Sequence, residues 1–283
     1  MKLARFDAGR GAELGLVTDA GIVSISRALP QIGGGMTDLI RRWDEVRADV
    51  AALAGRPADA MLDRTRLLAP VERPGKVMAI GLNYADHIAE SGLPTPTEQT
   101  WFAKMGTAVN GPNDPIQVPK VSEALDYEAE MVFVVGRGGR HIAREDAARA
   151  VFGYCVGNDV SVRDWQMATS QWLMGKSFDT HAPFGPWITT ADEVLDPHVL
   201  DIRCTVNGEL RQLSNTRHLV FDVWDQVAHL SKAMTLEPGD VVYTGTPAGV
   251  GMAMTPRTWL KAGDRVRVEI TGLGVIEAEC RAE

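Results

Sequence analysis

Residues 125–136 read LDYEAEMVFVVG and join an acidic stripe to an apolar strand signal. The apolar run 131–135 is typical of a strand inside a core. The carboxylates of Asp126, Glu128 and Glu130 lie at alternate positions just before this run. Because side chains alternate across a strand, these three would share one face. Like charges at such short distances repel one another, and the repulsion grows as water is withdrawn. The stretch therefore predicts either a solvent-exposed acidic face or a bound cation.

Length, composition and charge bound the fold and the partners. The chain has 283 residues, 45% hydrophobic and 23% charged, which is ordinary for a soluble globular protein. The net charge of -8 argues against general nucleic-acid binding, which needs a basic surface. The three cysteines lie far apart without CxxC spacing and predict no disulfide framework or zinc site. With no apolar signal core and no long apolar run, we expect a cytoplasmic protein without a membrane partner.

Turn and periodicity signals divide the chain into two predicted units. The TDAG turn at 18–21 predicts a hairpin, and apolar residues recur at helical spacing over 39–53. The stretch LAPVERPGKV at 68–77 carries two prolines and predicts a linker. We therefore expect a small N-terminal α/β domain over residues 1–70 and a larger domain over residues 71–283.

Strands dominate the larger unit. LDIRCTVNGELRQ at 200–212 has Asn-Gly at its centre, the strongest local hairpin signal. DRVRVEITGLGVIEAEC at 264–280 predicts a second alternating pair. Helices are expected around 144–151 and 219–234, the latter with one apolar stripe. Because strands outnumber helices and do not alternate with them regularly, the pattern favours a strand-rich α+β fold over a doubly wound sheet.

A third carboxylate would strengthen a cation site on the acidic stripe. Hard divalent cations such as magnesium prefer carboxylate oxygens, and two on one strand face can converge on one ion. GNDVSVRDWQ at 157–166 offers Asp159 directly after a short predicted strand. The alternatives are that Glu128 and Glu130 form an exposed acidic face and that Asp159 only turns the chain. Spacing alone does not decide between these interpretations.

GLNYADHIAESG at 81–92 predicts a short helix that carries His87 and Glu90 three positions apart. Residues at this spacing are neighbours on a helix, so Glu90 could orient His87 and stabilise its cation. A histidine suits general-base work near neutral pH. The alternative is an ion pair on a helix surface.

Two stretches resemble phosphate sites without matching one. LMGKSFDT at 173–180 ends like a P-loop, but Ser170 stands where the first glycine belongs. GTPAGVG at 245–251 lacks the dinucleotide spacing. It predicts a glycine-rich turn, whose backbone N–H groups and Thr246 could hold an anionic group.

The motifs GLNYADHIAE, LDYEAE, NDVSVRDWQ, GKSFDT and TGTPAGVG, in that order, resemble the fumarylacetoacetate hydrolase superfamily. The resemblance covers about residues 75–280, and the first unit is similar to the leading domain of bacterial two-domain, acylpyruvate hydrolase-like members. It implies a mixed β-roll, barrel-like C-terminal domain, a homodimer, and a Mg²⁺ or Mn²⁺ cofactor.

The resemblance also implies roles for nine residues. The implied metal ligands are Glu128, Glu130 and Asp159. The implied catalytic residues are the water-activating pair His87 and Glu90, together with Lys176. The implied substrate-binding residues are Arg163, Gln166 and Thr246.

The expected activity is metal-dependent hydrolysis of the carbon–carbon bond of an acylpyruvate or other 2,4-diketo acid, which yields pyruvate and a carboxylic acid. The H-x-x-E pair favours hydrolysis, because only hydrolysis requires an activated water. Isomerisation of a 2-hydroxy-dienoate (the 2-hydroxyhepta-2,4-diene-1,7-dioate type) and decarboxylation of oxaloacetate reach the same enolate and remain alternatives. A non-catalytic binding protein with this fold is disfavoured by the retained site residues. The substrate's R group depends on loops around 93–99 and 170–174, where Trp172 either contacts substrate or belongs to the core.

Overall fold

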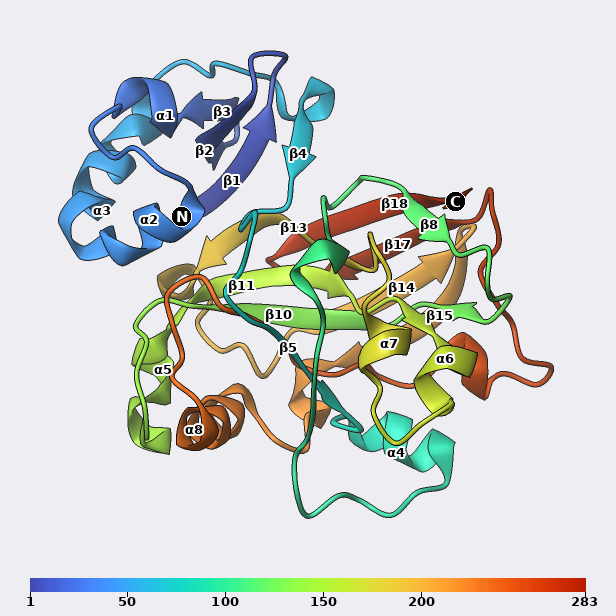
Figure 1. Cartoon of the computed structure of the whole chain (residues 1–283). Helices are drawn as coiled ribbons and strands as arrows, with labels where there is room; N and C mark the ends of the chain where they lie inside the picture. The colour runs from blue at the N-terminus through green and yellow to red at the C-terminus, as the bar shows by residue number, and fades with distance from the viewer.

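The structure is a computed structural model that describes residues 1–283, and it confirms a strand-rich α+β fold (Figure 1). Eleven strands form one central sheet: β1 (Lys2–Asp7), β2 (Ala12–Thr18), β3 (Gly21–Ser24), β4 (Arg66–Leu68), β5 (Val77–Gly81), β6 (Thr100–Ala103), β7 (Val109–Asn110), β10 (Ala129–Val135), β11 (Val151–Asn158), β13 (Ala182–Thr190) and β16 (Val241–Tyr243). Their order is β3-β2-β1-β13-β11-β10-β16-β5-β6, with β4 on β1 and β7 on β13. The sheet is mixed, because β16 and β5 run parallel while β10 and β11 run antiparallel.

A second sheet packs against β10, β11 and β13 of the central sheet. Its strands, in the order β15-β14-β17-β18-β8, are β15 (Glu209–Asn215), β14 (Asp201–Val206), β17 (Arg265–Ile270), β18 (Gly274–Ala282) and β8 (Ile116–Val118). The two predicted strand pairs of this region are confirmed as β14–β15 and β17–β18. Asn207 and Gly208 turn the first pair with φ of 53° and 80°, as an Asn-Gly hairpin requires. A separate short pair joins β9 (Leu125–Asp126) to β12 (Ser161–Val162).

The helices are short and lie around the sheets (Figure 1). The α-helices are α1 (Ile25–Ala28), α2 (Met36–Arg41), α3 (Trp43–Ala51), α4 (Ala85–Ser91), α5 (Ala147–Ala150), α6 (Arg163–Met167), α7 (Leu173–Lys176) and α8 (Val223–Ala233). The 3₁₀ turns are η1 (Ala52–Gly55), η2 (Leu62–Arg64), η3 (Gly106–Ala108), η4 (Arg144–Asp146), η5 (Ala191–Glu193), η6 (Thr216–His218) and η7 (Gly251–Ala253). None of these helices has the length and apolar character needed to cross a bilayer.

Two expected helices differ in extent from the prediction. The helix expected over 39–53 is α2 and α3, separated at Arg42, whose guanidinium donates to the carbonyls of Gln31 and Ile32 at 3.1 and 2.9 Å. The helix expected from residue 219 begins only after Asp222, which accepts from the backbone N–H of Asp225 in a capping box. Apolar periodicity could not predict the start of α8, because it depends on a side-chain hydrogen bond to the backbone.

Strand β10 is buried on both faces, which explains its unbroken apolar sequence. Met131, Phe133 and Val135 belong to the core between the two sheets. Val132 and Val134 face a second core that the central sheet shares with α2 and α3. The acidic stripe therefore leads into the middle of the molecule.

The first unit extends the central sheet. Lys2 and Leu3 of β1 pair with Thr189 and Ile188 of β13, and β4 pairs with β1. In Figure 1 this unit lies at one end of the sheet, with α1, α2 and α3 to the left of β1, β2 and β3. The boundary at residue 70 stays a prediction.

Candidate metal centre and active site

Three carboxylates, Glu128, Glu130 and Asp159, meet where β10 and β11 pair; we call them the carboxylate cluster. Glu130 is in β10, Glu128 precedes that strand, and Asp159 follows β11. The register of the pair brings the segments together, and the Asp159 N–H donates to the Glu128 carbonyl at 2.9 Å. One oxygen from each carboxylate lies within 4.8 Å of the other two. All three side chains are buried. The cluster could therefore hold a metal ion.

Two buried lysines reach into the cluster. Lys176, at the end of α7, donates to Glu128 Oε2 at 2.6 Å and to Asp159 Oδ2 at 2.7 Å. Lys104, which follows β6, pairs with Asp159 Oδ1 and donates to the Val160 carbonyl at 3.2 Å. Sequence reasoning assigned Lys176 to the site but gave Lys104 no role. A lone lysine in WFAKMG carries no spacing signal.

The carboxylates of the cluster are not equivalent. Burial acts to raise the pKa of Glu128, but the charges of Lys176 and Arg163 outweigh it and hold that pKa at about 2. Burial raises the pKa of Glu130 well above its usual range, and the charges of Asp159 and Glu128 raise it further. Burial also lowers the pKa of Lys104, against the opposing effect of Asp159. Glu130 is thus the carboxylate that most needs an added positive charge.

The charge balance around the cluster fits a divalent cation. With every group ionised, as metal binding would require, four buried carboxylates here face three buried cations, which leaves one negative charge. The groups are Asp126, Glu128, Glu130 and Asp159 against Lys104, Arg163 and Lys176. A divalent ion would turn this excess into one positive charge, which suits a ligand with a carboxylate. The donor set, which consists of oxygens only, is the type that Mg²⁺ and Mn²⁺ accept.

Arg163, at the start of α6, is held between two carboxylates. Its Nε donates to Asp126 Oδ2 at 2.8 Å, and its Nη1 lies 2.7 Å from Glu128 Oε1. Nη1 also donates to Gln166 Oε1 at 2.9 Å. Its Nη2 is buried without a protein partner, so it is free to donate to a ligand. Asp126, which shares the parity of the glutamates but was left out of the predicted ligand set, supports the arginine.

The glycine loop, residues 245–252, binds carboxylates from three parts of the site. The Gly245 N–H donates to Glu130 at 2.7 Å, that of Gly249 to Glu90 at 3.0 Å, and that of Gly251 to Asp126 at 2.8 Å. The anionic groups that these N–H groups hold are therefore the protein's own. Thr246 Oγ1 accepts from Gln212 Nε2 at 2.8 Å.

His87 and Glu90 lie on α4, which ends at Gly92 in the left-handed conformation with φ of 66°. The His87 Nδ1 lies 3.2 Å from Glu90 Oε2. Both side chains are partly buried, at 14% and 25% exposure. His87 is close enough to act electrostatically on Glu128. The pair is therefore not a plain surface ion pair, because it faces the carboxylate cluster.

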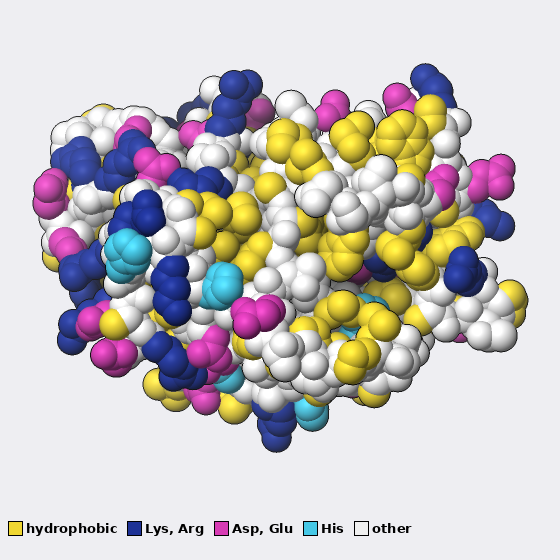
Figure 2. All heavy atoms as spheres, turned by 60° about the horizontal axis from the view of Figure 1, so that its bottom comes forward, with side chains coloured by type: hydrophobic (Ala, Val, Ile, Leu, Met, Phe, Trp, Pro, Cys, Tyr) yellow, Lys and Arg dark blue, Asp and Glu magenta, His cyan; other side chains and the backbone are white.

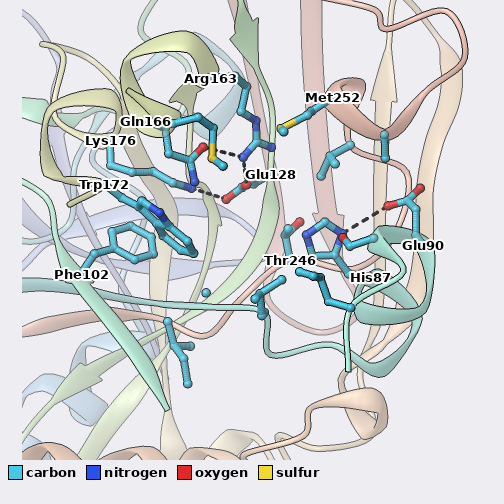
Figure 3. Close-up of a pocket in the computed structure, with 18 of the residues that line it drawn as sticks. His87, Glu90, Phe102, Glu128, Arg163, Gln166, Trp172, Lys176, Thr246 and Met252 are labelled. Carbon is cyan, nitrogen blue, oxygen red and sulfur yellow. Dashed lines mark hydrogen bonds and ion pairs between the residues drawn. The ribbon is translucent and has the colours of Figure 1, made fainter. Parts of the chain in front are cut away.

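A cavity of about 400 Å³ joins these groups (Figure 3). Figure 2 shows the face of the molecule that points downward in Figure 1. Hydrophobic side chains gather on the right-hand part of this face, whereas charged side chains dominate its left-hand part. Asp159 does not line the cavity, but its Oδ2 accepts a hydrogen bond from Lys176, which does. The other eight predicted site residues line the cavity: His87, Glu90, Glu128, Glu130, Arg163, Gln166, Lys176 and Thr246. Their roles stay predictions.

Comparisons with known proteins agree with this arrangement. Residues 76–281 match the family model described as fumarylacetoacetate (FAA) hydrolase, C-terminal. The mitochondrial oxaloacetate tautomerase fahd2 of Xenopus laevis is 51% identical over 212 residues, 74% of this chain and 66% of that protein. The mitochondrial oxaloacetate tautomerase FAHD2A of Homo sapiens is 42% identical over 284 residues, 98% of this chain and 90% of that protein.

A solved structure with the same fold is maleylpyruvate hydrolase from Sphingobium sp. SYK-6, in complex with manganese(II) ion and pyruvate. It superposes with a TM-score of 0.84 at 36% identity and covers 100% of this chain and 99% of its own. Fold, motif order and family match agree, and the chain belongs to the fumarylacetoacetate hydrolase family.

Proposed function

We propose that this protein is a divalent-metal-dependent enzyme that moves protons on 2-oxo acids and interconverts the keto and enol forms of an oxaloacetate-type acid. The observation that carries the proposal is the His87–Glu90 pair, which faces the carboxylate cluster across one cavity. A base and a cation site on the two sides of one bound molecule suit removal of a proton next to a carbonyl group. The two relatives named as oxaloacetate tautomerases add support.

In this proposal the residues of the cluster, Glu128, Glu130 and Asp159, hold Mg²⁺ or Mn²⁺. When bound, that ion supplies Lewis acidity, which polarises the keto group beside the substrate carboxylate. Arg163 offers its unpaired Nη2 to a substrate oxygen. Lys176 lies beside Glu128, so its charge stabilises negative charge that develops on the enolate oxygen.

His87 would act as the base. Its Nδ1–H donates to Glu90, which leaves Nε2 free to take the proton from carbon 3 of the substrate. Glu90 is itself fixed by the Gly249 N–H, so the imidazole keeps its orientation and its cation is stabilised. The proton on Nε2 then passes through solvent to the enolate oxygen, which gives the enol and restores neutral His87. In the reverse direction Nε2 returns the proton to carbon 3 and the keto form results.

Hydrolysis of an acylpyruvate is the second candidate, and the His87–Glu90 pair supports it too. Here His87 would take a proton from water, which attacks the carbonyl carbon distant from the carboxylate. The carbon–carbon bond then breaks, which releases the carboxylic acid, and its electron pair forms the enolate of pyruvate, stabilised by Lys176. The enolate takes up the proton from His87 and leaves as pyruvate. The likeness to a maleylpyruvate hydrolase supports this candidate. Decarboxylation, the homodimer and the cytoplasmic location stay predictions.

The test compares reactions in one panel. Purified protein with Mn²⁺ is incubated with oxaloacetate, and the reaction is monitored by the ultraviolet absorbance of the enol. Separate reactions with acylpyruvates are monitored by the release of pyruvate. We expect His87→Ala to lower the rate by about 10²- to 10⁴-fold. Glu128→Ala should remove the Mn²⁺-dependent part of the activity. His218→Ala is the control, because His218 is exposed in η6 and outside the cavity. No Mn²⁺-dependent reaction of any 2-oxo acid, or full activity in His87→Ala, would refute the proposal.

A further inference from the structure

We infer that the cavity holds an apolar group of the substrate beside the 2-oxo acid head, against an aromatic wall formed by Phe102 and Trp172. The inference rests on the proposed function and names the substrate class more narrowly: a 2-oxo acid with an aliphatic or aromatic tail. The relevant observations are the composition of the cavity, its size and the way in which the wall is built.

The cavity has a charged floor and an apolar wall. Its floor is the buried cluster of Glu128, Glu130, Arg163 and Lys176. Around the floor stand mainly apolar side chains, which include Ile80, Leu82, Leu93, Phe102, Met167 and Trp172. The second carboxylate of an oxaloacetate-type acid would stay at the charged floor, whereas a hydrocarbon tail on the same acid would leave water for the wall.

The size of the cavity points the same way. Its volume of about 400 Å³ lies in the range of pockets that enclose ligands of drug size, which is about 300–1,000 Å³. A four-carbon diacid chelated at the floor would fill only a small part of it. The apolar wall lines part of the same cavity, so a substrate with a tail has both room and an apolar surface there.

The aromatic wall is built by a contact between segments distant in sequence. A Cβ atom at Gly81, the last residue of β5, would lie 2.3 Å from Trp172 Cζ3 and 2.7 Å from Cη2. Gly81 does not have a left-handed backbone conformation, so its backbone does not require glycine. Its lack of a side chain instead lets the indole lie on the strand. Packing thus fixes Trp172 at the cavity edge.

The wall adjoins the head of the site. The rings of Phe102 and Trp172 are 5.5 Å apart and tilted by 60°. Lys176 Nζ, which donates to Glu128, also lies over the Phe102 ring at 4.9 Å from its centroid. In Figure 3 the two rings lie on one side of Glu128, and the His87–Glu90 pair lies on the other. A tail against the wall would therefore leave the base free to act.

The test measures binding, so it does not depend on which reaction follows. Full-length protein loaded with Mn²⁺ is titrated by calorimetry with oxalate, which has no tail, and with pyruvate, 2-oxobutanoate, 2-oxopentanoate and 2-oxohexanoate. We expect affinity to rise by about three- to fourfold for each methylene that the wall buries. Trp172→Gln should reduce this rise to less than about twofold per methylene and leave oxalate affinity unchanged.

Two further variants separate the wall from general damage. Gly81→Ala displaces the indole, so it should weaken the binding of the longer acids and not that of oxalate. Trp165→Ala is the matched control, because Trp165 is on α6 but packs on Phe178 outside the cavity. It should keep the wild-type rise.

An affinity that does not rise with chain length, or an equal rise in Trp172→Gln and wild type, would overturn the inference. Oxalate and pyruvate would still bind in that case, so the proposed function would stand. If neither oxalate nor pyruvate binds in the presence of Mn²⁺, the proposed function fails as well as the inference.

Discussion

His181 provides a quantitative test of how the fold buries a titratable group. It directly precedes β13 and is fully buried, with its ring stacked on Phe178 at 5.6 Å. Its Nε2 lies 2.7 Å from the Gln117 carbonyl and donates to it, while its Nδ1 is buried without a partner. Burial lowers the pKa of His181 from 6.5 to about 4, and the charge of Lys104 acts in the same direction.

The sign of the pH effect follows from this lowered pKa. The unfolded chain keeps the ordinary value, so between pH 6.5 and pH 4 the unfolded state binds more protons than the folded one. The free energy of unfolding therefore falls as the pH falls through this window. The shift corresponds to about 2 kcal/mol lost between pH 8 and pH 5, and about 3 kcal/mol in total at still lower pH.

The assay is urea unfolding at pH 8 and pH 5 for the wild type and His181→Gln, whose amide can still donate to the Gln117 carbonyl. Other groups also titrate in this range, so the quantity of interest is the difference between the two proteins. The variant should lose about 2 kcal/mol less than the wild type on acidification. His218→Ala, which changes an exposed histidine, should behave as the wild type. Equal pH dependence in His181→Gln and wild type would refute the reasoning.

Two substitutions at the cluster follow from the same electrostatics. Glu130→Gln removes the carboxylate whose pKa is raised by burial and by two like charges. The variant should keep the stability of the metal-free protein and lose the stabilisation by Mn²⁺. In thermal melting, Mn²⁺ at 100 times its Kd should stabilise the wild type by about 2.7 kcal/mol and leave the variant unchanged. Asp126→Asn leaves Arg163 with Glu128 as its one carboxylate partner, so we expect a cost of about 1.5–3 kcal/mol in urea unfolding, the usual contribution of a hydrogen bond to a charged group. An unchanged midpoint would show that Asp126 does not hold the arginine.

The sequence could predict those parts of the fold and site that leave a local signature. Strand β10 has both faces buried, so its apolar run is continuous, and the Asn207–Gly208 turn requires positive φ angles. The carboxylate cluster was predictable because alternation puts Glu128 and Glu130 together and the motif order supplies a third ligand. The family expected from that motif order is confirmed.

Other parts depend on contacts between distant segments and could not be predicted. Lys104 pairs with Asp159, and Trp172 lies on Gly81; neither contact has a periodic signature. The structure assigns Asp126, which the sequence left without a partner, to Arg163. Hydrolysis was the expected reaction and stays a prediction, because the same base and cluster serve proton transfer, hydrolysis and isomerisation alike.

The glycine loop has a consequence for how this enzyme could change during evolution. One backbone segment orients Glu130, Glu90 and Asp126, so any shift of the loop alters metal affinity, base strength and the arginine together. These three carboxylates are therefore expected to move together. Phe102 and Trp172 come from other segments, β6 and the residues just before α7, and neither contacts the glycine loop through a hydrogen bond. Such a division would let the aromatic wall change while the loop keeps its three carboxylates in place.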